Sequence, residues 1–70
     1  MRAKVFYAVQ FCVEERHLET VKKVVHLFGV VVTHVMQEPD GAFRIFLEAV
    51  PADLWYTIKH ELEVRGVEVM

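Results

Sequence analysis

Apolar and polar side chains alternate along the first part of the chain. Over residues 4–13 the odd positions are all apolar: Val5, Tyr7, Val9, Phe11 and Val13. A period of two places these side chains on one face of an extended segment. The pattern therefore predicts a first β-strand whose odd-numbered side chains face the core.

The apolar spacing then changes to that of a helix. Apolar residues recur every three or four positions, at Leu18, Val21, Val25 and Phe28. Glu14 and Glu15 precede this stretch, where negative charge favours a helix N-terminus. Gly29 follows it and suits the left-handed position after a helix. A first helix is expected between these limits.

A β-hairpin is expected next. Residues 30–37 are rich in β-branched side chains, and Glu38-Pro39-Asp40-Gly41 has the composition of a turn. Residues 42–50 alternate again, with inward positions at Phe43, Ile45, Leu47 and Ala49.

A second helix follows the hairpin. Pro51 fits its first turn and Asp53 favours its dipole. Its buried stripe contains Leu54 or Trp55, Ile58 and Leu62. Gly66 ends it in the same left-handed conformation predicted for Gly29, and residues 67–70 are expected to form a short fourth strand.

The two glycine-containing segments 28–32 and 65–69 read alike and lie 37 residues apart. This repeat indicates two copies of one βαβ-like unit. The sequence thus predicts a single α+β domain over residues 1–70, a ferredoxin-like βαββαβ sandwich. Its antiparallel sheet would have the order 4-1-3-2, with both helices on one face.

That arrangement leaves the other sheet face uncovered. The side chains expected there are Phe6, Ala8, Gln10, Cys12, Val31, Thr33, Val35, Arg44, Phe46 and Glu48. A 70-residue chain that is 54% hydrophobic and has one cysteine needs stabilisation that a disulfide cannot supply. We therefore expect a homodimer or higher homo-oligomer, with interface residues Phe6, Ala8, Val31, Val35 and Phe46.

The net charge and the residue pattern of the chain argue against nucleic-acid and membrane partners. A formal charge of −2 and a pI near 6.0 do not attract phosphate backbones. Phe6 and Phe46 occupy strands whose aromatics stack bases in RNA-recognition domains, but residues 40–44 lack the usual basic-glycine-aromatic run. No nucleic acid is expected.

The chain has no apolar run of membrane-spanning length and no signal-peptide pattern at its start, so no membrane partner and a cytoplasmic location are expected.

The sequence contains few residues in the arrangements that catalysis requires. The chain has no serine and no asparagine, and Cys12 lies near carboxylates that would weaken a thiolate. The histidines at 17, 26, 34 and 60 have no metal-ligand spacing. His34 is expected in an inward apolar row, where it would need a hydrogen-bond partner. A non-enzymatic protein without metal or cofactor is expected.

Residues 18–70 also resemble a known family. Val21-Lys22-Lys23-Val24-Val25-His26-Leu27-Phe28-Gly29-Val30-Val31-Val32 and the tail Leu62-Glu63-Val64-Arg65-Gly66-Val67-Glu68-Val69 are similar to NIL domains, relatives of the ACT ligand-sensing domains. The family's Asn-Ile-Leu tripeptide falls on Thr33-His34-Val35.

The resemblance implies a dimeric regulatory domain that binds a small molecule, with an amino acid as one candidate. The expected site is the loop between the first strand and helix, through Glu14, Arg16 and His17, together with Thr33 of a second subunit. Backbone donors at the helix start and the Arg16 guanidinium would hold a carboxylate there. The alternative is a structural interaction module without a ligand.

Overall fold

A computed structural model describes residues 6–69 of the chain. The predicted strand positions Lys4 and Val5, and the C-terminal Met70, lie outside this range. The elements in chain order are β1 (Phe6–Val13), the 3₁₀ helix η1 (Glu15–His17), α1 (Leu18–Leu27), β2 (Val32–Gln37), β3 (Phe43–Pro51) and α2 (Ala52–Val64).

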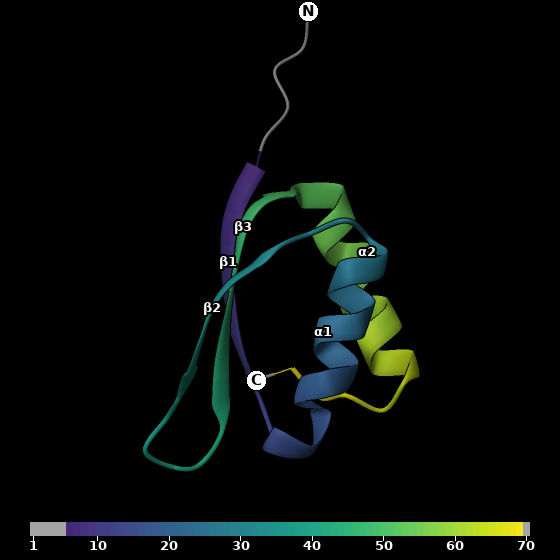
Figure 1. Cartoon of the computed structure of the whole chain (residues 1–70). Coiled ribbons are helices and arrows are strands. Elements are labelled where there is room, and N and C mark those ends of the chain that lie inside the picture. The colour runs from purple at the N-terminus through teal and green to yellow at the C-terminus, as the bar shows by residue number, and fades with distance from the viewer. Residues whose placement is uncertain (1–5, 70) are drawn as a thin grey trace, which may run out of the picture.

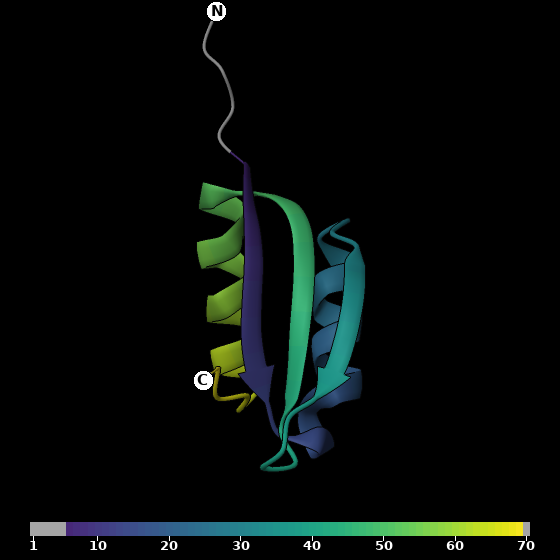
Figure 2. The same ribbon diagram turned by 90° about the vertical axis from the view of Figure 1, so that its left-hand side faces the viewer.

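The three strands form one antiparallel sheet in the order β1-β3-β2. Figure 1 shows α1 and α2 together on one side of this sheet, and Figure 2 shows the sheet in front with both helices behind it. The predicted α+β architecture with two helices on one face is confirmed. The predicted fourth strand is not formed by residues 67–69, which lie in no strand.

Apolar side chains fill the space between the helices and the sheet. The buried positions are Phe11, Val13, Val21, Val24, Val25, Ile45, Leu47, Val50, Ile58, Leu62 and Val67. No polar or charged residue among residues 6–69 is buried with them. This apolar core holds the sheet against the helices and leaves the opposite face of the sheet outside it.

Both helices end in the same backbone motif. Gly29 and Gly66 have φ values of +73° and +80°, as the sequence predicts. The Gly29 N–H donates to the His26 carbonyl (2.9 Å) and the Val30 N–H to the Val25 carbonyl (3.1 Å). Gly66 and Val67 repeat these two bonds at the end of α2, at 3.0 and 2.8 Å. These are Schellman ends, and they explain why the two glycine-containing segments read alike.

The β2–β3 connection is the expected tight turn. The Gly41 N–H donates to the Glu38 carbonyl (2.9 Å), and Gly41 has a φ of +91°. The Asp40 side chain accepts a hydrogen bond from the Ala42 N–H at 3.0 Å. The aspartate and glycine together fix the direction in which β3 leaves the turn.

A β-bulge in β2 corrects the predicted phase of this strand. Val32 pairs with Leu47 and His34 with Phe46, so Thr33 and His34 together oppose one residue of β3. The extra residue reverses the alternation beyond it. Val35 therefore pairs with Ile45 and packs against the core, so its predicted place on the uncovered face is wrong. His34 is exposed instead of lying in the inward row.

A second bulge lies on the other side of β3. Tyr7 pairs with Val50 and Val9 with Leu47, so β3 has one more residue than β1 over this interval. Ala49 adopts a φ of +56° and is exposed, whereas Val50 is buried. The prediction that Ala49 faces inward is wrong because the bulge turns Val50 inward in its place. Tyr7, also predicted inward, is 51% exposed near the start of β1.

Within residues 6–69, neither helix has the length and apolar character needed to cross a membrane.

Candidate functional site

The face of the sheet opposite the helices carries the main candidate surface, called here the outer face. We define it by Phe6, Ala8, Gln10, Cys12, Thr33, His34, Met36, Arg44, Phe46 and Glu48. Phe6 and Met36 are 51% and 44% exposed, and Phe46 is half-buried. Figure 2 shows no helix over this face. The outer face thus presents aromatic and aliphatic surface to solvent.

An ion pair and an amide occupy the end of the outer face near the β2–β3 turn. The Arg44 guanidinium donates to the Glu38 carboxylate and, at 3.0 Å, to the Gln10 side-chain carbonyl. The hydrogen bond to Glu38 is the main cause that raises the pKa of Arg44 above its ordinary value, and the negative charge of the Glu38 carboxylate adds to it. Arg44 therefore stays charged and is already paired within the chain.

Aromatic contact and a hydroxyl define the middle of the outer face. The rings of His34 and Phe46 lie 5.5 Å apart at an angle of 54°. The Thr33 hydroxyl donates to the Phe46 carbonyl at 3.2 Å. This bond ties the extra residue of the β2 bulge to the central strand.

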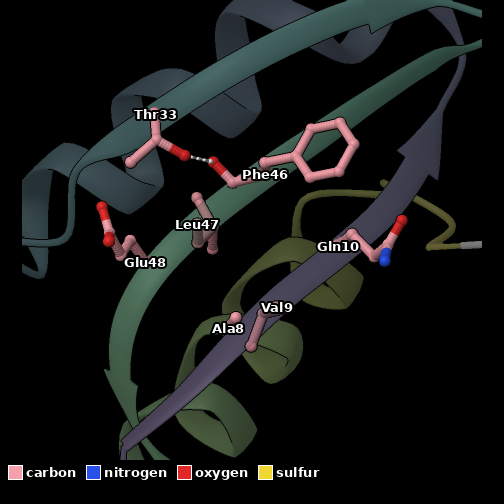
Figure 3. Close-up of a pocket in the computed structure, with 7 residues that line it drawn as sticks. All are labelled: Ala8, Val9, Gln10, Thr33, Phe46, Leu47 and Glu48. Carbon is pink, nitrogen blue, oxygen red and sulfur yellow. Dashed lines mark hydrogen bonds between the residues drawn. The ribbon is translucent and has the colours of Figure 1, made fainter.

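A hollow of about 280 Å³ opens on the outer face beside these residues. Its lining is Ala8, Val9, Gln10, Thr33, Phe46, Leu47 and Glu48, drawn in Figure 3. All three strands contribute, and both bulges border it. The small Ala8 side chain and the bulged backbone leave this space open.

The predicted ligand loop lies elsewhere and is acidic. The Arg16 guanidinium pairs with the Glu14 carboxylate at 2.9 Å, and these side chains are 72% and 56% exposed. A shallow hollow of about 430 Å³ lies between this loop and the hairpin turn, lined by Glu14, Glu15, Arg16, Asp40, Gly41 and Ala42. Three carboxylates and one guanidinium give this hollow a net negative charge, which opposes a carboxylate ligand.

The structure does not bring all the predicted ligand residues together within one chain. Glu14 and Arg16 are in contact, and His17 is half-buried beside them in η1. Thr33 belongs to the outer-face hollow and not to the hollow of the loop. The site predicted from the sequence takes Thr33 from a second subunit.

The predicted interface residues divide into two groups. Phe6, Ala8 and Phe46 lie on the outer face, whereas Val31 is exposed in the segment before β2 and Val35 packs against the core.

In residues 6–69, no three side chains of the His, Cys, Asp or Glu type converge as metal ligands would.

Sequence reasoning placed Gln10 and Glu48 on the uncovered face but did not find the hollow between them. It also missed His34 as a neighbour of Phe46. Both features depend on bulges, and a strict alternation pattern contains no bulge. The small residues Ala8 and Ala49, which fall within the register shift between β1 and β3, are the sequence signal nearest to the hollow.

Comparisons of this chain with known protein families, curated proteins and solved structures found no match.

Proposed function

We propose that this protein is a non-enzymatic module that assembles with a second copy of itself through the outer face and binds a small molecule there. The observation that carries the proposal is the outer face, which no helix covers in Figure 2 and on which Phe6 and Met36 are exposed and Phe46 is half-buried. Exposed apolar side chains on an uncovered sheet face favour association, because burial removes them from water.

Three other exposed apolar side chains belong to the helices and not to the sheet. Leu27 lies in the last turn of α1, Tyr56 in the first half of α2 and Val64 at its end. Single exposed apolar residues are ordinary on protein surfaces. The outer face is therefore the favoured contact.

We propose the ferredoxin-like arrangement, with strand order 4-1-3-2, as the complete fold. The order β1-β3-β2 and the placement of both helices support it. Val67 is buried, and Figure 2 shows the chain after α2 beside the β1 edge of the sheet. A fourth strand along β1 would pair an otherwise open edge.

A structural interaction module without a ligand is the second candidate. Two observations favour it. Arg16 is already paired with Glu14, and the Thr33 hydroxyl is already bonded to Phe46. A carboxylate ligand at the predicted loop would have to compete with the Glu14 carboxylate for Arg16.

Sedimentation equilibrium tests the assembly. Phe46→Glu places a charge in the centre of the proposed interface, so we expect weaker association than in the wild-type protein. Tyr56→Glu is the matched control, because Tyr56 is an aromatic residue on α2 with 71% exposure. A wild-type monomer throughout the concentration range, or equal weakening by both variants, would contradict the proposal.

A thermal-shift screen against amino acids, amines and nucleotides tests the ligand. A molecule that binds the folded state raises its melting temperature. A ligand at the loop predicted from the sequence, in place of the outer face, would lose about 1–2 kcal/mol of affinity in Arg16→Ala, the range for a lost hydrogen bond, whereas Arg16→Ala should leave binding at the outer face unchanged. An assembled protein that responds to none of these compounds would favour the interaction module.

A further inference from the structure

The outer-face hollow has a floor and a rim of different character. Val9 and Leu47 form an apolar floor, since Leu47 is buried and Val9 packs against the core. The rim combines a phenyl ring from Phe46 with the methyl group of Ala8 and the polar side chains of Gln10, Thr33 and Glu48. Figure 3 shows Phe46 and Glu48 projecting from β3 on either side of Leu47.

Glu48 is the one ionisable residue in this lining. Its side chain is exposed, and it makes no ion pair with any other residue in the range 6–69. The other polar groups of the rim already have partners, because Gln10 accepts from Arg44 and Thr33 donates to Phe46. A carboxylate without an ion-pair partner at one end of the hollow and an aromatic ring at the other are suited to an organic ammonium ion, because the carboxylate attracts the charge and the ring packs against an apolar body.

We propose that the hollow binds a small organic ammonium ion, a primary amine with an apolar body. The ammonium group pairs with the Glu48 carboxylate, and the apolar body lies on the Phe46 ring and the Val9–Leu47 floor. The hollow of about 280 Å³ is slightly smaller than the pockets that hold drug-sized ligands, so the ligand has a single ring or a short chain.

This inference rests on the proposed function, because the hollow is open to water in one chain. An exposed ion pair contributes at most about 1 kcal/mol. A second copy packed on the outer face closes the hollow, excludes water and strengthens the attraction between the ammonium group and Glu48. Binding and assembly are therefore coupled, and the amine stabilises the assembled form.

Isothermal calorimetry with two matched probes tests the charge preference. Phenethylamine carries an ammonium group on a phenyl body, and phenylacetate carries a carboxylate on the same body. We expect heat of binding with phenethylamine and none with phenylacetate. Equal binding of the two probes, or binding of phenylacetate alone, would overturn the proposal.

Two variants test the site, with a third as control. Glu48→Gln keeps the shape and removes the charge, so affinity for phenethylamine should fall about tenfold, the effect of losing a charged hydrogen bond. Ala8→Leu should abolish binding of phenethylamine altogether, because the larger side chain fills the hollow. Glu63→Gln removes an exposed carboxylate on α2 and should leave binding unchanged. Equal affinities of wild type and Glu48→Gln would overturn the site.

Sedimentation of the same samples separates the two proposals. An assembled wild-type protein that gives no heat with phenethylamine would overturn the amine site and leave the assembly intact. A monomer that gives no heat would overturn both. Phenethylamine should shift the wild-type protein, and not Glu48→Gln, toward the assembled form.

Discussion

Ala49 shows how one residue can decide the course of a strand. Its φ of +56° is a left-handed conformation that costs an L-residue about 1–2 kcal/mol, and glycine adopts it freely. The surrounding sheet holds it there because the bulge allows both Leu47 and Val50 to reach the core. The strain of one residue is offset by the burial of another.

Ala49→Gly should therefore stabilise the protein. Relief of the left-handed strain outweighs the extra freedom that glycine gives the unfolded chain, and the expected net gain is about 0.5 kcal/mol. Urea denaturation measures it. Ala8→Gly, in the facing strand and without positive φ, is the control and should lose about 0.5–1 kcal/mol. A loss of stability in Ala49→Gly as large as that in Ala8→Gly would contradict the strained bulge.

Gly29 is the corresponding case at a helix end. A Cβ atom built there meets no atom within 4 Å, so the cost of a side chain comes from the backbone alone. Gly29→Val should destabilise by about 1 kcal/mol or more. Gly29→Asn should lose less in the same denaturation experiment, because asparagine tolerates the left-handed region. Equal losses for the two variants would point to a steric cause instead.

Individual elements were predictable where their signals are local. Gly29 and Gly66 correctly predicted where the two helices end, and Pro39-Asp40-Gly41 correctly predicted the hairpin turn. The side-chain directions in β2 and in the second half of β3 were not predictable, because each bulge adds a residue and reverses the alternation beyond it. The predicted loop site requires a free Arg16 guanidinium. The spacing of residues in the sequence does not show that Arg16 pairs with Glu14.

The β2 bulge makes a prediction at the level of the strand. Val35 packs against the core and His34 does not, so Val35→Ala should destabilise by about 1–2 kcal/mol, part of the loss for a fully buried side chain. His34→Ala should stay within about 0.5 kcal/mol under conditions where the protein is monomeric. Thermal or urea unfolding compares the two losses of stability. A larger loss in His34→Ala than in Val35→Ala would contradict the bulge and support the uninterrupted alternation predicted from the sequence.

In the molecule as a whole, the uncovered sheet face is the feature on which the proposed assembly and the proposed binding both depend. The helices cover one side of a three-stranded sheet, and the other side combines exposed apolar residues with a hollow. A small domain has limited apolar surface to bury internally, so a second copy on the outer face, as we propose, would add to its stability. The proposed assembly buries this face.

Cys12 offers the most direct test of that claim, because it is the one thiol in the chain and lies on the outer face, paired across strands with Arg44. The measurement is the initial rate of reaction of Cys12 with a thiol reagent as protein concentration increases. We expect the rate per molecule to fall in proportion to the fraction assembled by sedimentation, and Phe46→Glu to keep the fast rate of the monomer. A rate that stays constant while the wild-type protein assembles would show that assembly leaves the outer face uncovered, and would contradict the proposed interface.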